Sequence, residues 1–279
     1  MSPWWLVLII PISVLAGVVL AAMLAAGKEA DRISEAMASR PPEPVTVKVT
    51  RYIPQDLWME KILENTYRNI NIGLVNEMAI LCEKMGINVW EVIEAAKTKP
   101  FGFQAFYPGP GLGGHCIPLD PYYLSWKARE FGFHTSMIEA SMMINDRMPE
   151  YTVERSGKIL NRHRKPLNGS KVLVLGVAYK QDIDDYRESP AIRVIEEFHK
   201  TGANVDFYDP FVEKYREKGV WYEGLKAIDT EILHQYDLVC IATGHTTVDY
   251  DMVCNAGVPV FDCKNVMKKI ANRANIEVL

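Results

Sequence analysis

The 279-residue sequence predicts an α/β protein with three parts: an N-terminal membrane helix, an all-helical middle region and a C-terminal doubly wound parallel sheet. A long uncharged apolar run near the N-terminus predicts the first part. Apolar residues that recur at helical spacing between residues 56 and 145 predict the second. Short apolar runs after residue 170 alternate with a helical stretch and predict the third, because strand–helix–strand units in series form parallel sheets.

The N-terminal apolar run, from Trp4 to Ala26, contains no charged residue. At about 1.5 Å per residue it is long enough to cross a hydrocarbon core of about 30 Å. We therefore expect a single-pass transmembrane anchor at residues 1–27 and a polar, Pro-rich linker at residues 28–55. Basic residues follow the run and none precedes it, which predicts that the body of the protein lies in the cytoplasm. A cleaved signal peptide is the alternative, since small residues crowd the end of the run.

Composition argues against some classes of function. The net charge of −4 and the lack of a long basic run argue against a nucleic-acid-binding protein. The five cysteines show no short paired spacing, which fits a reducing compartment. The sequence has neither a C-x-x-C pair nor a cluster of histidines and cysteines, so no metal site is expected.

The middle region opens with a long predicted helix from Asp56 to Met85, whose apolar residues form a broad face. Gly86 is expected to end this helix, since glycine is common just after a helix C-terminus. Asn88 and Glu91 resemble a capping box and predict a second helix over residues 89–96.

Two further predicted helices complete the middle region, which we place at residues 56–150. Asp120 followed by Pro121 predicts a helix N-terminus, with the aspartate as N-cap and the proline as first helical residue. The stretch from Thr135 to Asn145 predicts another helix. The remaining residues, 151–279, form the predicted C-terminal domain.

Short apolar runs in the C-terminal domain predict parallel strands in KVLVLGVAY, NVDFYDP, DLVCIAT and PVFDCKN. After the first run, Ser189 as N-cap and Pro190 at the first position predict a helix that reaches Thr201. Ligands of such sheets bind at the carboxyl ends of the strands. The segments expected around one crevice there are residues 176–180, 209–210, 243–245 and 262–265.

One loop, PGPGLGGHCIPLDP at residues 108–121, combines a thiol with glycines. Four glycines precede Cys116 and leave backbone that a ligand can approach closely. A cysteine on such a loop is a candidate nucleophile beside a bound substrate. The alternative is a tight loop with an incidental small apolar residue, because free cysteines are usually buried and inert.

Three segments resemble the UDP-glucose/GDP-mannose dehydrogenase family: KILENTYRNINIGLVNE, GGHCIPLDP and VLGVAYKQDIDDYRESPA. The resemblance covers residues 56–266. The His-Cys-Ile-Pro form is most similar to the UDP-N-acetylglucosamine and UDP-N-acetylmannosamine 6-dehydrogenases, with UDP-glucose enzymes as the next branch. The resemblance implies that the helical central region forms a homodimer and that the C-terminal Rossmann-like domain binds the UDP-sugar.

The family oxidises the C6 alcohol of a UDP-sugar to a carboxylate with NAD, in polysaccharide precursor synthesis. The resemblance implies that Cys116 is the nucleophile and holds the intermediates as a thiohemiacetal and a thioester. It also implies that Asp120 helps to activate water, that Lys61 stabilises the oxyanion and that Asn65 orients the intermediate. Spacing alone favours a helix cap for Asp120 and a solvated surface pair for Lys61 and Asn65.

The resemblance further implies a set of substrate-binding residues. They are Phe106, Tyr107, Gly109, Gly111, Gly113, Gly114, Tyr179, Lys180, Arg187 and Lys264. The alternatives are plain core for the aromatic pair and an interdomain ion pair for Arg187. Lys264 stands where the family usually has arginine, and because lysine lacks the bidentate fork, weaker ligand binding is expected from this position.

The family's NAD-binding domain has no recognisable counterpart in this sequence. That domain holds NAD at a Gly-x-Gly-x-x-Gly turn between a strand and a helix, whereas Gly17 and Gly27 are the only glycines in the first fifty residues. We therefore expect a UDP-sugar 6-dehydrogenase that uses an NAD domain from another chain, with its cofactor-binding residues unknown. The alternatives are a membrane-anchored, non-catalytic subunit that binds UDP-sugar or dimerises, and an inactive fragment.

Overall fold

The computed structural model describes residues 55–279, and residues 54–279 form one compact unit. The predicted membrane anchor and most of the predicted linker lie outside the described residues. Within residues 55–279 no helix combines the length and the apolar character that a membrane crossing needs.

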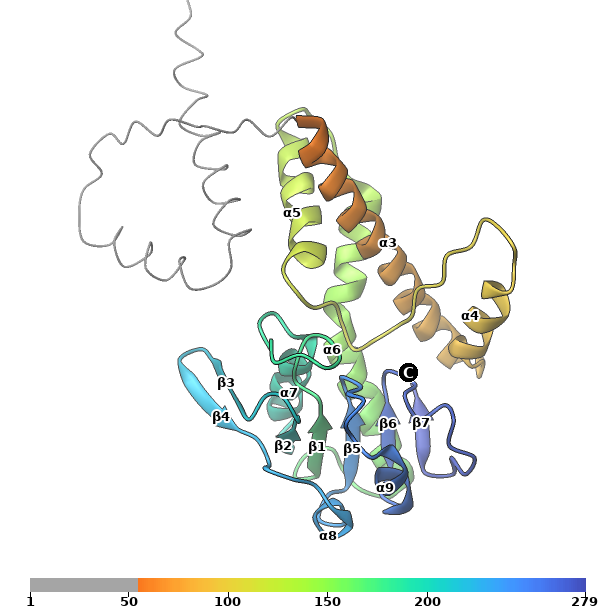
Figure 1. The fold of residues 1–279 in the computed structure, drawn as a ribbon, viewed down its shortest axis with the longest axis vertical. Coiled ribbons are helices and arrows are strands. Elements are labelled where there is room, and N and C mark those ends of the chain that lie inside the picture. Colours follow the sequence, from red (N-terminus) through yellow and green to blue (C-terminus); the bar gives the residue numbers. More distant parts are fainter. Residues whose placement is uncertain (1–54) are drawn as a thin grey trace, which may run out of the picture. The chain divides into compact units, whose positions relative to one another are not determined.

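The helical region contains α3 (Gln55–Met85), α4 (Val89–Lys97), α5 (Cys116–Arg129) and α6 (Ser136–Arg162). Helices α3, α5 and α6 lie alongside one another, as Figure 1 shows. Gly86 follows α3 with a φ of 71°, which confirms its predicted place after the helix. Asn88 caps α4 by accepting from the Trp90 N–H at 3.0 Å, and its amide also meets Glu91. Both predicted helices are confirmed.

Helix α5 begins at Cys116, so the prediction that Asp120 caps it was wrong. Asp120 lies in the second turn and Pro121 lies inside the helix. A proline in a helix leaves the carbonyl four residues before it without its usual donor. That carbonyl belongs to Ile117, and Asn69 of α3 donates to it at 3.1 Å. The helix tolerates Pro121 because another helix supplies the missing hydrogen bond.

Helix α6 is longer than predicted and continues well past Asn145. It joins the helical region to the sheet, because Met148 near its middle and Ile159 and Leu160 near its end belong to a hydrophobic core that the helix shares with the sheet. The predicted domain boundary between residues 150 and 151 therefore falls inside this helix.

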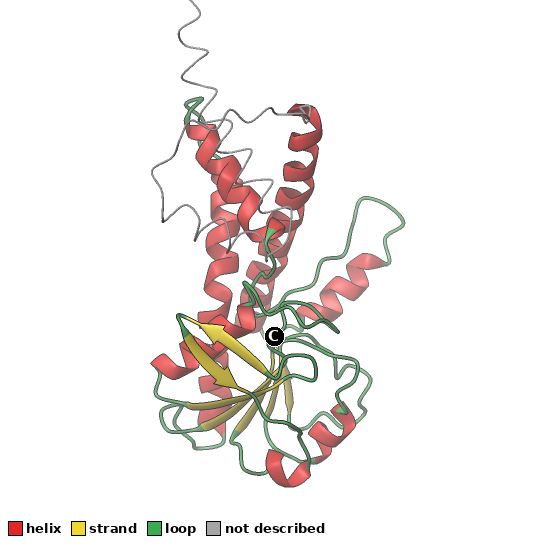
Figure 2. Cartoon of the chain, turned by 60° about the vertical axis from the view of Figure 1, so that its left-hand side comes forward, coloured by secondary structure: helices red, strands yellow, loops and turns green. Residues whose placement is uncertain are grey.

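The C-terminal domain contains a five-stranded, entirely parallel sheet in the order β2-β1-β5-β6-β7, labelled in Figure 1 and drawn in yellow in Figure 2. Its strands are β1 (Lys171–Leu175), β2 (Asn204–Tyr208), β5 (Leu238–Ile241), β6 (Val260–Asp262) and β7 (Ile276–Val278). Alternate residues of β1 belong to the hydrophobic cores on opposite faces of the sheet. Val172 and Val174 lie in the core that includes residues of α6 and α7 (Pro190–Lys200). Leu173 and Leu175 lie in the core that includes residues of α8 (Thr230–Leu233) and α9 (Tyr250–Asn255). Helices on both faces confirm the doubly wound sheet.

A hairpin that the sequence prediction missed lies beside this sheet. It consists of β3 (Lys214–Glu217) and β4 (Val220–Glu223), and Gly219 in its turn has a φ of 84°. Tyr215 is buried and its ring stacks on Tyr222 with 5.0 Å between ring centroids. One buried side chain between charged neighbours gives little of the period-two pattern that marks a strand.

Candidate functional site

The structure brings together three of the four residues that the sequence proposed for catalysis. Asn65 of α3 donates through Nδ2 to Asp120 Oδ2 at 2.7 Å. Cys116 lies one helical turn before Asp120 on α5, so their side chains share a face. Of the five cysteines, Cys116 is exposed and the other four are buried. Only this thiol is therefore open to a molecule bound at the surface.

The local environment raises the pKa of two side chains in this group, Cys116 and Asp120. Burial, together with the nearby charge of Asp120, raises the pKa of the Cys116 thiol. Burial also raises the pKa of the Asp120 carboxyl, and the hydrogen bond from Asn65 offsets this only in part. Cys116 is thus a protonated thiol at neutral pH, and Asp120 is a stronger base than an ordinary carboxylate.

Lys61 does not join the pair formed by Asn65 and Asp120. Its ammonium lies 3.5 Å from Glu64 on the same helix, and its side chain is 68% exposed. This is the solvated arrangement that spacing alone favoured. The role that the resemblance implies for Lys61 stays a prediction.

The glycine loop, residues 108–115, packs against side chains of the C-terminal domain. A Cβ on Gly109 would lie 2.7 Å from Lys264 Nζ, and one on Gly113 would lie 2.8 Å from Pro190 Cδ. Side chains of the C-terminal domain thus occupy the Cβ side of these two glycines, so a ligand would meet their backbone from another side. Gly111 has a φ of 142°, and a Cβ on it would lie 2.7 Å from Pro190 Cβ, so it needs glycine for both reasons.

Two predicted substrate residues of the C-terminal domain border this loop. The Tyr179 ring covers Gly114, where a Cβ would lie 3.2 Å from Cε2. Lys264 reaches Gly109, and burial lowers the pKa of its ammonium, with the nearby Cys263 and Asp262 opposing that effect. The structure thus places both predicted substrate residues at the glycine loop.

The remaining predicted substrate residues have varied surroundings. Lys180 is exposed. Arg187 makes a bidentate pair with Asp185, with Nε–Oδ1 at 2.9 Å and Nη2–Oδ2 at 2.8 Å. Phe106 meets Tyr67 edge to face. Their substrate roles stay predictions.

Tyr107 is tied to α4 rather than to the glycine loop. Its ring stacks on Trp90 with 5.8 Å between centroids, and its hydroxyl donates to Glu94 at 2.6 Å. Its substrate role also stays a prediction.

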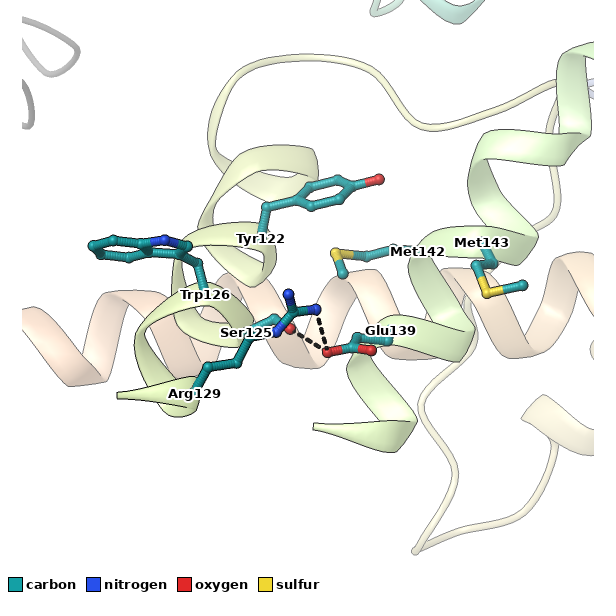
Figure 3. A pocket seen from close by; sticks show the side chains of 7 residues that line it. All are labelled: Tyr122, Ser125, Trp126, Arg129, Glu139, Met142 and Met143. Carbon is teal, nitrogen blue, oxygen red and sulfur yellow. Dashed lines mark hydrogen bonds and ion pairs between the residues drawn. The ribbon is translucent and has the colours of Figure 1, made fainter. Parts of the chain in front are cut away.

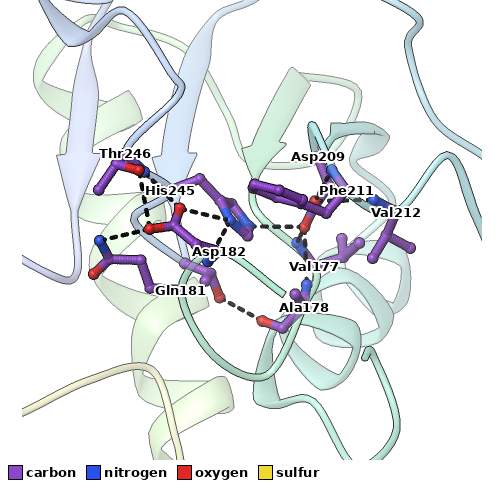
Figure 4. Close-up of polar contacts among 10 residues, drawn as sticks. Val177, Ala178, Gln181, Asp182, Asp209, Phe211, Val212, His245 and Thr246 are labelled. Carbon is purple, nitrogen blue, oxygen red and sulfur yellow. Dashed lines mark hydrogen bonds and ion pairs between the residues drawn. The ribbon is translucent and has the colours of Figure 1, made fainter. Parts of the chain in front are cut away.

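The carboxyl ends of β1, β2 and β5 meet at a buried aspartate, as Figure 4 shows. Asp209 Oδ2 accepts from the N–H groups of Val177 and Ala178 at 2.7 and 2.9 Å. His245 Nδ1 accepts from the Asp182 N–H at 3.0 Å, so its proton is on Nε2, which donates to Asp209 Oδ2 at 3.0 Å. These contacts hold the loop that carries Tyr179 and Lys180.

The hydrogen bonds around Asp209 favour its ionised form. Burial by itself raises the pKa of this carboxyl, but hydrogen bonds from His245, Ala178 and Phe211 outweigh burial and lower the pKa below its usual value. Asp209 is therefore a buried carboxylate whose charge is satisfied by N–H donors.

This arrangement also decides whether the turn after β1 fits NAD. In a dinucleotide-binding domain, free N–H groups of that turn face the diphosphate. Here the Val177 and Ala178 N–H groups are taken by a carboxylate, and a Cβ on Gly176 would lie 2.3 Å from the Thr243 carbonyl oxygen. The turn after β1 does not fit NAD.

A surface hollow of about 330 Å³ lies between α5 and α6 (Figure 3). It is lined by Tyr122, Ser125, Trp126, Arg129, Glu139, Met142 and Met143. None of the proposed site residues lines it. Among residues 55–279 no three side chains of His, Cys, Asp or Glu are grouped as a metal site requires.

Sequence reasoning missed the buried asparagines Asn69, Asn76 and Asn145, which lie between the helices behind the glycine loop. A signal for two of them was present. Asn69 and Asn76 follow Asn65 by four and eleven residues, which places all three on one face of α3.

The fold and site define a class of protein: a doubly wound nucleotide-binding type of sheet joined to a helical region that presents one exposed thiol. Two family models match, the central domain of the UDP-glucose/GDP-mannose dehydrogenase family at residues 58–147 and its UDP binding domain at residues 173–269. The chain belongs to this family.

Named relatives agree with this assignment. The chain is 39% identical to Protein CapL of Staphylococcus aureus over 213 residues, which cover 74% of this chain and 49% of the relative. It is 36% identical to the UDP-N-acetyl-D-glucosamine 6-dehydrogenase of Pseudomonas aeruginosa over 186 residues, which cover 67% of this chain and 43% of the relative. The chain thus spans about half the length of the curated relatives it matches.

A solved structure shares the fold as well. The UDP-D-ManNAc dehydrogenase of Pyrococcus horikoshii superposes with a TM-score of 0.68 at 30% identity, and the match covers 80% of this chain and 51% of that one.

Proposed function

We propose that this chain carries the thiol site and the nucleotide-sugar-binding domain of a UDP-N-acetylhexosamine 6-dehydrogenase. The observation that carries the proposal is the Asn65–Asp120 hydrogen bond beside the one exposed cysteine, Cys116. The names of the relatives support the substrate class.

The proposed chemistry begins with a thiol that must lose its proton. The Cys116 sulfur adds to the C6 aldehyde of the partly oxidised sugar: an S–C bond forms, and the carbonyl π electrons move to oxygen, which takes up a proton. Asp120 takes up the thiol proton, since burial makes its carboxylate a stronger base, and it keeps the part in activating water that the resemblance implies. Asn65 holds Asp120 in place through its amide. The covalent link keeps the aldehyde from escaping between the two oxidations.

NAD is the oxidant that the family implies. Because the turn after β1 is closed by Asp209, we assign no residue of this chain to NAD and derive no step through it. Homodimer formation through the central helices and membrane anchoring through residues 4–26, with the body in the cytoplasm, are further proposals that rest on the sequence.

Binding of UDP-N-acetylglucosamine, UDP-N-acetylmannosamine and UDP-glucose to the purified chain, measured by calorimetry, tests the proposal. We expect an N-acetylhexosamine derivative to bind more tightly than UDP-glucose and to slow alkylation of Cys116 by iodoacetamide. Binding without protection of Cys116 would favour the non-catalytic subunit. A chain that binds none of the three would contradict both.

A further inference from the structure

A continuous chain of hydrogen bonds joins the two ends of the glycine loop through three buried asparagines. The Gly109 N–H donates to Asn76 Oδ1 at 3.0 Å, and Asn76 Nδ2 donates to Asn145 Oδ1 at 2.9 Å. Asn145 Nδ2 donates to the main-chain carbonyl oxygen of Asn69 at 3.1 Å. Asn69 Nδ2 then donates to the Ile117 carbonyl, also at 3.1 Å. We name Asn69, Asn76 and Asn145 the asparagine chain.

Each end of the asparagine chain meets backbone that has no other regular partner. Gly109 lies in the loop, outside any helix or strand. The Ile117 carbonyl lacks its helical donor because Pro121 has no N–H. The asparagine chain thus fixes the beginning of the glycine loop and the first turn of α5, the turn that carries Cys116.

A close crossing of α3 and α6 makes the asparagine chain possible. A Cβ on Gly73 would lie 2.4 Å from Ser141 Oγ, so only glycine allows the two helices to approach this far. At that distance Ser141 Oγ donates to the Asn69 carbonyl at 2.8 Å, and Asn145 reaches the same carbonyl.

Stability explains part of this choice, because Asn76 pairs the Gly109 N–H and Asn69 pairs the Ile117 carbonyl. It does not require that the two asparagines be linked to each other through Asn145, and the three residues are only 1%, 0% and 3% exposed. A fully satisfied polar network in a core fixes one arrangement in space more strictly than apolar contacts do. Its ends are aimed at the glycine loop and at the turn that carries the thiol.

We propose that Asn69, Asn76 and Asn145 are positioning residues that set the glycine loop at a fixed distance from Cys116, so that a sugar held at the loop presents C6 to the thiol. The inference rests on the proposed function. The position of the sugar over Cys116 then depends on the asparagine chain. The affinity for the UDP moiety does not, because the C-terminal domain binds that moiety.

The test compares Asn76→Ala and Asn69→Ala, which cut the asparagine chain at opposite ends, with Asn71→Ala as control. Asn71 is also on α3, but its amide only returns to the Tyr67 carbonyl of its own helix. For each variant we would measure the affinity for UDP and the protection of Cys116 from iodoacetamide by saturating UDP-N-acetylglucosamine. Protection is the ratio of labelling rates without and with ligand, so a changed thiol reactivity cancels.

We expect both cut variants to keep the affinity for UDP and to lose protection by about 10-fold or more, because the bound sugar is no longer held over Cys116 and leaves the thiol open to iodoacetamide. The double variant should lose no more than either single variant, since one path is cut twice. Asn71→Ala should match the wild type. Asn69→Ala leaves the partly buried Ile117 carbonyl unpaired, while Ser141 and Asn145, which lose Asn69 Oδ1, keep the main-chain carbonyl of Asn69 as acceptor. It therefore remains a test if Asn76→Ala does not fold.

One outcome would contradict the positioning role of the asparagine chain, and a different outcome would contradict the proposed function. Folded cut variants with wild-type protection, or losses that add in the double variant, would overturn the positioning role and leave the proposed function standing. A wild-type protein that binds UDP-N-acetylglucosamine without any protection of Cys116 would remove the proposed function itself.

Discussion

Asp209→Asn offers a direct test of how the carboxyl ends of the strands are held. Asp209 Oδ2 accepts from three donors, the Val177 and Ala178 N–H groups and His245 Nε2. Its Oδ1 accepts from the N–H groups of Phe211 and Val212 at 2.8 and 3.1 Å. An amide has only one oxygen, so in either orientation at least two N–H donors would face an NH₂ group.

The expected loss follows from those two donors. A buried donor without an acceptor costs about 1–3 kcal/mol, and because the Phe211 N–H is only partly buried, we expect a total of about 2–4 kcal/mol. Urea unfolding of wild type and variant measures it, provided that the denaturant slope is unchanged. Asp249→Asn is the control, since Asp249 caps α9 through one bond and asparagine caps equally well, which predicts a loss below about 0.5 kcal/mol.

The lowered pKa of Asp209 predicts how the loss of unfolding free energy in Asp209→Asn changes with pH. The folded-state pKa of Asp209 is lowered, so its contribution is fully present above the unfolded-state value of about 3.9 and is lost as the pH falls through the folded-state value. The difference between wild type and Asp209→Asn should therefore be constant at neutral pH and shrink only below about pH 4. Equal losses for Asp209→Asn and Asp249→Asn would refute this account of the sheet end.

Two further predictions concern glycine packing and the thiol. Gly176 and Gly219 have φ values of 83° and 84°, so alanine at either position costs the same left-handed backbone strain of about 1–2 kcal/mol. The two positions differ in their surroundings: a Cβ at Gly176 meets the Thr243 carbonyl oxygen, whereas nothing lies within 4 Å of a Cβ at Gly219. Gly176→Ala should therefore lose at least about 1–3 kcal/mol more in urea unfolding, and equal losses would show that the contact relaxes freely. Asp120→Asn removes a negative charge that raises the pKa of Cys116. The curve of the Cys116 alkylation rate against pH should therefore move to lower pH. A curve that does not move would show that burial alone raises this pKa.

The sequence predicts the C-terminal domain well because its signals are local. The continuous apolar run that becomes β1 is buried on both faces, and Ser189 with Pro190 marks the start of α7, as the structure confirms. Helix α5 was misplaced because Asp-Pro at a helix start and Asp-Pro inside a helix look alike in sequence. What separates them is the donor that Asn69 supplies from 48 residues away.

The candidate site shows the same division between local and tertiary information. The motif around Cys116 identified the thiol, and the resemblance supplied Asn65 and Asp120, which the structure joins by a hydrogen bond. The packing of the glycine loop on Pro190 and Lys264 depends on how two regions of the chain meet, and so does the path through the asparagine chain. Neither has a signature in local sequence.

The most direct test of the central claim is NADH formation from NAD and a UDP-N-acetylhexosamine by the wild-type protein, by Cys116→Ser and by Cys254→Ser, each mixed with the separately expressed NAD-binding domain of a relative. Cys254 is buried in the core of the sheet domain and serves as the control. The account predicts NADH with the wild type and with Cys254→Ser, and no net formation of the sugar acid with Cys116→Ser. Undiminished turnover in Cys116→Ser, or a wild type that binds both the UDP-sugar and the added NAD-binding domain and forms no NADH, would contradict it.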